Sequence, residues 1–469
     1  MHVSQAQAPS LRRVVNAEPV MLGLLRSRAA VVLVSLIYSA VLYHAHAGYL
    51  ETEWPQFGFT HFAVAPLDGL MVSLLVAIGA LFVPSSLQRP SSIVLLVLFA
   101  VVYVPTMVIT VGTAPDAFDR HRSLLGALAL AFAAPCLAVR LQAPSTTVGG
   151  VPGRTFVWLL LAAWAGCCVV LVASYGSMMR FVGEEQLYVQ RAAGASTSLA
   201  MGYAQTYFAN VLNPALVAVG LVKRRWWLVW VGIAGCLVMY MINAQRTVLA
   251  LPVVMIGLYF MLLHGKRLLS STAAIIGGLA GTVQVSVSTY QVNGLSAALG
   301  QYLVCRTLAG PGLTLSQYYE VFSIQGYTWW SHVRGISAFV PAPVVYANDA
   351  KWPYLGYFIG DWYHASPTWN INAHIFSADG VASAGALGVI VMGAVLALWL
   401  LVLDRACRGW DRTFTLLVLL PIAVVLTNGS LFTTLLSFGG LFWTALFLLY
   451  KPRLLARPAP TLLVVPASK

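Results

Sequence analysis

Four polar residues whose side chains are unfavourable in the hydrocarbon core of a membrane lie close together before a long apolar run. They are Asn370, Asn372, His374 and Asp379, in the stretch W-N-I-N-A-H-I-F-S-A-D-G. A histidine or a carboxylate can orient a hydroxyl group or take its proton, and an asparagine amide can hydrogen-bond to it. We therefore expect His374 or Asp379 to orient or deprotonate a hydroxyl group, with Asn372 hydrogen-bonding to the same ligand. A lone Asp or Asn at a helix start can instead be an N-cap.

The apolar run that follows carries small residues at every fourth position. Gly380, Ala384 and Gly388 would form a ladder on one face of a helix that runs from residue 372 to 388. Small residues at this spacing let membrane helices approach each other closely. The pattern predicts one helix that packs tightly against its neighbours and carries the polar residues, His374 included, at its exposed mouth.

A second group of candidate residues is cationic and lies upstream. The stretch 305–335 holds Arg306, His332 and Arg334. Arginine has forked donors that match phosphate oxygens, so this group could hold a diphosphate. Arg246, in the short turn N-A-Q-R-T, could reach the same phosphates. Alternatively, these residues bind ordinary anionic head groups or cap helix ends, and Arg246 snorkels to the membrane surface.

The composition predicts that membrane-spanning helices position these groups. Of 469 residues, 59% are hydrophobic and 9% are charged, whereas about 25% are charged in soluble domains. Apolar runs of 18 or more residues recur along the chain, and each could cross a roughly 30 Å hydrocarbon layer as a helix. The sequence predicts an all-α polytopic membrane protein that forms a single membrane domain over residues 1–469.

The apolar runs predict about twelve transmembrane helices joined mostly by short connections. The predicted spans are residues 29–47, 66–84, 91–113, 123–139, 155–175, 198–222, 226–243, 247–263, 268–288, 382–403, 413–428 and 431–450. One connection is different, because residues 289–381 would form a large outer loop with short helices. A loop of this length is a candidate for the working part of the protein.

The basic residues predict the orientation in the membrane. With the N-terminus in the cytoplasm, 19 of the 27 Lys and Arg residues face the cytoplasm. These are Arg12, Arg13, Arg26, Arg28, Arg89, Arg140, Arg154, Lys223, Arg224, Arg225, Lys266, Arg267, Arg405, Arg408, Arg412, Lys451, Arg453, Arg457 and Lys469. This asymmetry follows the positive-inside rule and predicts that both termini are cytoplasmic. The net charge of +13 therefore reflects topology, and we expect no nucleic-acid binding. A cleaved signal peptide ending at Ala47 is an alternative for the first span, but the charge count favours a retained segment.

The predicted outer loop is rich in aromatic residues, with eighteen between Thr289 and Val381. Trp and Tyr gather at membrane interfaces as anchors. Their rings also stack on the C–H faces of sugars, and their mixture with Arg, Asn, His and Asp suits a glycan groove. The residues assigned to this groove are Tyr318, Tyr319, Asp361, Trp362 and Asn372.

The order of these residues resembles that of a known family. The ordered set is Arg306, Pro311, Gly312, Tyr318, Tyr319, Phe322, Ser331, His332, Asn372, His374, Asp379, Gly380, Gly385 and Gly388. It is similar to the O-antigen polymerases (Wzy-type), which join oligosaccharide repeat units. The likeness covers about Arg306 to Asp404, with a weaker echo at Asn243 to Leu249.

The resemblance implies a GT-C-like glycosyltransferase in the bacterial inner membrane, active on the periplasmic face. It implies transfer of a growing glycan from undecaprenyl diphosphate to the non-reducing end of a new lipid-linked repeat unit, without a cofactor or metal. Expected partners are this lipid-linked oligosaccharide, the bilayer and a chain-length co-polymerase of the Wzz type.

Roles for individual residues also follow from the resemblance. Arg306, Arg334, His332 and Arg246 would stabilise the departing diphosphate. Family members carry functional arginines on two outer loops. The earlier loop is short here, so its arginines, Arg180 and Arg191, are secondary candidates that could equally belong to a solvated turn.

Three other functions are open. An O-antigen ligase uses the same donor but delivers the glycan to a lipopolysaccharide core. A metal-dependent transferase that uses a polyprenyl-monophosphate sugar would employ an acidic pair, for which Glu51 and Glu53 are candidates. A flippase or transporter should place charges in mid-membrane and show two related halves. Only Asp68, near the edge of a span, fits that pattern.

Overall fold

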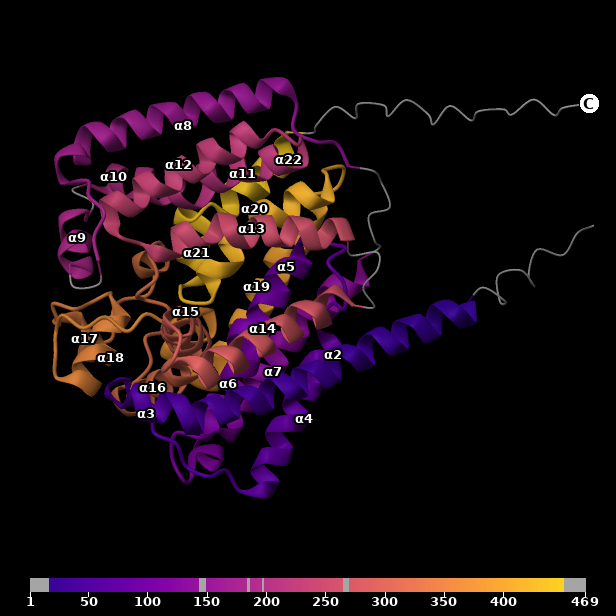
Figure 1. Ribbon diagram of the computed structural model, residues 1–469. Helices are drawn as coiled ribbons and strands as arrows, with labels where there is room; N and C mark the ends of the chain where they lie inside the picture. The colour runs from indigo at the N-terminus through magenta and orange to yellow at the C-terminus, as the bar shows by residue number, and fades with distance from the viewer. Residues whose placement is uncertain (1–16, 143–148, 184–185, 196–197, 265–269, 451–469) are drawn as a thin grey trace, which may run out of the picture. The chain divides into compact units, whose positions relative to one another are not determined.

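The computed structural model describes residues 17–142, 149–183, 186–195, 198–264 and 270–450 (Figure 1). These residues form helices and no β-strand, apart from one isolated bridge between Gly150 and Trp410. The predicted all-α class is therefore confirmed for the described part. Eight residues of the predicted cytoplasmic set lie outside it, namely Arg12, Arg13, Lys266, Arg267, Lys451, Arg453, Arg457 and Lys469.

Within the described residues, nine helices are long and apolar enough to cross a membrane. They are Arg26–Glu53, Ser91–Val111, Ala117–Leu141, Arg154–Met178, Leu199–Val222, Trp226–Asn243, Arg246–His264, Ser271–Thr289 and Phe376–Ala406. A pair bent by 54°, Leu431–Ser437 and Gly440–Leu449, counts as a tenth if it is one span. Two apolar helices are shorter, Pro66–Phe82 and Arg412–Leu426. Each of the twelve predicted runs thus contains an apolar helix, and the chain has the character of a polytopic membrane protein.

The chain divides into two compact units. The first takes its residues from 1–143, 257–404 and 419–440. The second takes its residues from 144–256, 405–418 and 441–469.

In the first unit, long helices pack along one another. Helix α14 (Ser271–Thr289) lies along α2 (Ala17–Ala45), and α4 (Pro66–Phe82) packs against α2 and α7 (Ala117–Leu141) (Figure 1). Helix α21 (Leu431–Ser437) also belongs to this unit, whereas α22 (Gly440–Leu449) belongs to the second unit from Leu441 onward.

Helix α16 (Gly310–Gln325) is held tightly against α6 (Val104–Val111). The contact depends on Gly312, because a Cβ there would lie 2.7 Å from the Cβ of Ile109. The close approach lets the Thr110 hydroxyl donate to the Gly312 carbonyl at 3.0 Å. Pro311 suits the first turn of a helix, where its missing N–H is not needed. The sequence G-P-G thereby fixes the start of α16.

The second unit contains α8 (Arg154–Tyr175), α9 (Leu187–Ala193), α10 (Leu199–Tyr207), α11 (Asn213–Val222) and α12 (Trp226–Asn243). Glycines again allow close packing, since a Cβ on Gly235 of α12 would lie 2.0 Å from Asn213 Oδ1. The same oxygen accepts a hydrogen bond of 2.7 Å from the Trp164 indole of α8. Helix α13 (Arg246–His264) begins in this unit.

Residues 289–381 contain the short helices that the sequence predicts. They are α15 (Gly294–Leu299), the π-helical η7 (Gly300–Ala309), α16, η8 (Ile336–Ala338), α17 (Val344–Ala347), α18 (Leu355–His364) and the π-helical η9 (Phe376–Val381). π-Helical turns are rare and frequently occur at functional sites. Two predicted site residues lie in them, Arg306 in η7 and Asp379 in η9.

The prediction of one continuous helix from residue 372 to 388 is wrong. Residues 370–374 are not helical, and α19 (Ala382–Ala406) is interrupted at Ala384 and Gly385, where φ is −156° and 58°. A Cβ on Gly388 would lie 2.1 Å from the Gly380 carbonyl oxygen. In a straight helix residues eight apart are separated by about 12 Å along the axis. The small residues therefore pack the two halves of this broken segment against each other.

Candidate active site

The structure brings together two predicted site residues from different segments of the first unit. His332 follows α16, and Asp379 lies in η9. The distance from His332 Nε2 to Asp379 Oδ1 is 4.0 Å. The Asp379 side chain is fully buried, and that of His332 is 9% exposed. A histidine beside a buried carboxylate is a combination that can accept and release a proton.

The loop that carries His332 is attached to the start of α19 by its backbone. Trp329 N donates to the Ser383 carbonyl at 3.0 Å, and Thr328 N to the Ala382 carbonyl at 2.9 Å. Trp329 and its neighbour Trp330 have φ of 51° and 59°. Such values are uncommon for bulky side chains, and this strain is frequent at functional sites. This strained turn precedes His332.

Thr328 sets the tautomer of His332. The Thr328 hydroxyl donates to the Ala382 carbonyl at 3.1 Å. Its oxygen therefore accepts a hydrogen bond from His332 Nδ1, which lies 2.9 Å away. With the proton on Nδ1, neutral His332 has a free lone pair on Nε2, on the side that faces Asp379.

Asp379 is fixed through its other oxygen. Oδ2 accepts a hydrogen bond of 2.5 Å from Leu431 N, at the start of α21. Within the described part of the chain, Asp379 Oδ1, His332 Nε2 and Ser383 Oγ are buried and have no hydrogen-bond partner. More than about 90% of buried polar groups are paired in native proteins. Two of these unpaired atoms, on His332 and Asp379, are the atoms that lie 4.0 Å apart.

His374 does not lie at an exposed mouth, as the sequence suggested, but in the interior. Its side chain is fully buried, and Nδ1 accepts a hydrogen bond of 3.2 Å from Phe376 N. Nε2 therefore carries the proton, and it lies 3.2 Å from the Pro311 carbonyl and 3.0 Å from Ser377 Oγ. Burial lowers the pKa of His374 to about 3, so the imidazole is neutral. It ties the start of η9 to the first turn of α16.

Two of the aromatic residues assigned to a glycan groove are not on an open surface. Tyr318 is buried, and its hydroxyl donates to the Ile371 carbonyl at 3.0 Å. Burial, and then the charge of Asp379, raises the pKa of the Tyr318 phenol. Tyr319 is half-buried and packs against the His121 ring at 5.5 Å. Asn372, by contrast, is exposed. The assignment of Tyr318 to an open groove is therefore wrong, because its side chain is part of the core behind Asp379.

Two candidate arginines of the first unit, Arg306 and Arg334, have exposed side chains. Arg306 is exposed, with its guanidinium carbon 5.9 Å from the centre of the Phe57 ring. Phe57 contacts Trp369 at 6.1 Å, and Trp369 stacks on His364 at 4.4 Å. Arg334, two residues after His332, is also exposed. Both arginines are available to an anion from solution.

The other candidate arginines belong to the second unit. Arg246 is half-buried and is the first residue of α13. Arg180 donates to Gln190 Oε1 at 2.9 Å, and the Arg191 guanidinium lies 5.6 Å from the centre of the Tyr188 ring. The contact with Gln190 gives Arg180 a structural role within its own unit.

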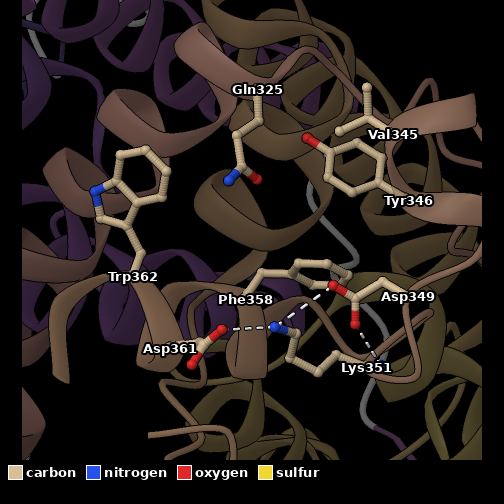
Figure 2. A pocket seen from close by; sticks show the side chains of 8 residues that line it. All are labelled: Gln325, Val345, Tyr346, Asp349, Lys351, Phe358, Asp361 and Trp362. Carbon is tan, nitrogen blue, oxygen red and sulfur yellow. Dashed lines mark hydrogen bonds and ion pairs between the residues drawn. The ribbon is translucent and has the colours of Figure 1, made fainter. Parts of the chain in front are cut away.

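A pocket of about 270 Å³ lies in the first unit and is shown in Figure 2. It is lined by Gln325, Val345, Tyr346, Asp349, Lys351, Phe358, Asp361 and Trp362. Two of these, Asp361 and Trp362, are residues that the sequence assigned to glycan binding. Ring contacts connect this pocket to the buried pair, because Tyr346 stacks on Trp352 at 5.5 Å and Trp352 meets His332 edge-on at 6.4 Å.

Several residues of this region were not expected from the sequence. Thr328, which holds His332, is an ordinary threonine in a loop and gives no local signal. Lys351 could have been found, because it is the only lysine among the eight basic residues outside the predicted cytoplasmic set. A lysine on the side of the membrane that is predicted to hold few basic residues, close to Asp349 and Asp361 in an aromatic loop, predicts a ligand-binding site.

The side chains of Glu51 and Glu53 accept hydrogen bonds from two different residues. Glu51 accepts a hydrogen bond of 3.4 Å from His61 N, and Glu53 accepts one of 3.1 Å from the Tyr290 hydroxyl. Among the residues that the structure describes, no group of three or more His, Cys, Asp or Glu side chains could hold a metal ion. The geometry therefore gives no support to a metal site at Glu51 and Glu53.

Comparisons of the chain with protein-family models, with curated proteins and with solved structures find no match. The class that the fold defines is an all-helical protein with several apolar helices long enough to span a membrane. Any more specific function must be argued from the buried pair, the pocket and the exposed arginines.

Proposed function

We propose that the protein is a polysaccharide repeat-unit polymerase. It would move a growing glycan from undecaprenyl diphosphate to the non-reducing end of a new lipid-linked repeat unit, on the periplasmic face of a bacterial inner membrane. The observation that carries the proposal is the buried pair His332 and Asp379, whose unpaired atoms are 4.0 Å apart. A pocket of a volume that suits one sugar ring lies in the same unit, and ring contacts of Tyr346 with Trp352 and of Trp352 with His332 connect it to the pair.

In this reaction the acceptor hydroxyl attacks the anomeric carbon of the donor sugar. The new glycosidic bond forms as the bond from that carbon to the diphosphate oxygen breaks, and undecaprenyl diphosphate leaves. The hydroxyl proton must go to a base. The hydroxyl would donate its one proton to His332 Nε2 at about 2.8 Å, and the N–H that forms there would face Asp379 Oδ1. We assign the proton to Nε2, because Thr328 keeps the Nδ1 proton in place.

Asp379 has a supporting role in this proposal. As His332 becomes an imidazolium, the carboxylate stabilises its positive charge in a buried setting where water does not screen the attraction. His374 cannot share this task, because it is neutral, buried and hydrogen-bonded through both ring nitrogens. We therefore move the role of base from His374 to His332 and treat His374 as a positioning residue.

The departing diphosphate needs cations. Arg306 and Arg334 are exposed in the same unit as the pair and are the candidates for this role. Losing one such donor typically lowers the rate by about 10²–10³. The proposal keeps the GT-C-like arrangement of about twelve spans, cytoplasmic termini and a Wzz-type co-polymerase as partner.

A deletion strain of the source organism provides the test. Cells without the gene should accumulate single repeat units on undecaprenyl diphosphate, and the wild-type gene should restore a ladder of longer lipid-linked glycans. Glycan that appears only on the lipopolysaccharide core would indicate a ligase. The purified protein in detergent should elongate the accumulated lipid, with and without a chelator. No elongation by folded protein on this substrate would refute the proposal, and that result is expected of a transporter.

A further inference from the structure

The pocket in Figure 2 is built by three successive segments of the chain. Gln325 is the last residue of α16, Asp349 and Lys351 follow α17, and Asp361 and Trp362 lie on α18. Pockets for drug-sized ligands measure roughly 300–1,000 Å³. A pocket of about 270 Å³ is therefore suited to one ring of a glycan rather than to several.

The pocket contains more negatively than positively charged side chains. Lys351 Nζ lies 2.6 Å from Asp361 Oδ2 and 3.4 Å from Asp349 Oδ2. It also lies 5.4 Å from the centre of the Phe358 ring. The hydrogen bond to Asp361 raises the pKa of Lys351, so the ammonium group stays charged. With two carboxylates and one ammonium group, these three side chains carry a net charge of −1.

Apart from the Gln325 amide, the groups left over for a ligand are mostly acceptors. Lys351 already has two carboxylate partners and an aromatic ring, and it meets Asp361 through Oδ2. Tyr346 uses its hydroxyl on the Gly326 carbonyl and so presents only its ring to the pocket. Trp362 is 48% exposed and offers an indole face. Acceptors beside an aromatic face match a pyranose, whose hydroxyls donate and whose C–H face stacks.

We infer that this pocket is a specificity subsite for one uncharged or amino-bearing pyranose ring, and that it excludes uronic acids. A carboxylate on the sugar would meet Asp349 and Asp361, while the one cation that could receive it is already engaged. This inference rests on the proposed function for its premise that the ligand is a glycan. It adds the chemical class of the sugar that the site accepts.

Binding of simple sugars to the full-length protein in detergent tests the subsite directly. The probes are methyl glucoside, glucosamine and glucuronic acid, measured by saturation-transfer NMR and calorimetry at neutral pH. The first two should bind, and glucuronic acid should bind at least about tenfold more weakly, one tenfold step being about 1.4 kcal/mol. Trp362→Ala should abolish binding, while Trp362→Phe should retain it because a stacking face remains.

The double variant Asp349→Asn/Asp361→Asn sharpens the test. It removes both negative charges and frees Lys351, so glucuronic acid should now bind more tightly than methyl glucoside. Lys351→Met is a second variant for the case that the first does not fold, and it should shift the preference further toward glucosamine. Asp119→Asn, an exposed carboxylate of α7, should change nothing.

Two outcomes would overturn the inference. One is a wild-type protein that binds glucuronic acid as well as the neutral sugar, and the other is a folded protein that binds none of the three. Because binding is measured without turnover, the two proposals can fail separately. Correct sugar selectivity without elongation would reject only the polymerase, and elongation without selectivity would reject only the subsite.

Discussion

The imidazole of His332 and the carboxylate of Asp379 face each other across 4.0 Å, and each keeps one buried atom without a hydrogen bond. Their other polar atoms are fixed, by Thr328 and by Leu431 N respectively. Leaving a buried polar group unpaired costs about 1–3 kcal/mol. Two such groups aimed at one gap are expected where a substrate supplies the missing partner.

His332→Gln and Asp379→Asn should each lower the rate of glycan elongation by about 10²–10⁴. Both replacements keep the size of the side chain but remove the basic nitrogen or the negative charge. The double variant should lose little more than either single one, because groups that act as a unit are not additive. The measurement is the rate of ladder formation in the complemented deletion strain at equal protein level.

His264→Gln and Asp119→Asn are matched controls for these two changes. Both residues are exposed, at the end of α13 and on α7. They should leave elongation unchanged. Near-normal elongation by His332→Gln, with the controls behaving as expected, would remove His332 from the mechanism.

The helices could be predicted from the sequence, but the arrangement of the candidate site could not. Long apolar runs specify membrane-spanning helices by themselves, because the backbone must satisfy its own hydrogen bonds in lipid. His332 and Asp379 were both recognised as candidates, yet in separate roles. Their meeting depends on the strained turn before His332 and on the backbone hydrogen bonds that tie this turn to Ala382 and Ser383, which no local pattern reveals.

The burial of individual side chains was the other property that the sequence did not show. His374 and Tyr318 have polar groups that suit a glycan groove, but the structure uses both to bond the backbone of neighbouring segments. Asp361 and Trp362, in contrast, do line a pocket. A residue type suggests chemistry, whereas burial is decided by tertiary packing that a single sequence does not encode locally.

The buried imidazole of His374 should make stability depend on pH. Its pKa is about 3 in the folded protein and about 6.5 in the unfolded chain. Between these values the unfolded chain binds the extra proton, so stability is full above about pH 6.5 and falls by about 1.4 kcal/mol per pH unit below it. His374→Gln should make the loss of stability below about pH 6.5 less steep, as measured by thermal unfolding of the detergent-solubilised protein. An unchanged slope would contradict the buried neutral histidine.

Gly388→Ala should destabilise the protein, because a Cβ there would lie 2.1 Å from the Gly380 carbonyl oxygen. Overpacking of this kind typically costs about 1–3 kcal/mol. Gly281→Ala on α14 is the matched control, since its Cβ would meet no atom within 4 Å. The control should be neutral or stabilising by up to about 1 kcal/mol, as alanine favours helix. The measurement is the melting temperature of each variant. Equal melting temperatures for Gly388→Ala and Gly281→Ala would argue against the broken helix.

Arg306→Ala should lower elongation by about 10²–10³ if its guanidinium receives the departing diphosphate. Arg306→Lys should restore only part of the loss, because lysine keeps the charge but lacks the planar fork that binds phosphate at two points and stacks on Phe57. The matched control is Arg122→Ala, an exposed arginine of α7, which should elongate normally. Rates at equal protein level check the order, and an Arg306→Ala variant as active as the control would exclude Arg306 from diphosphate binding.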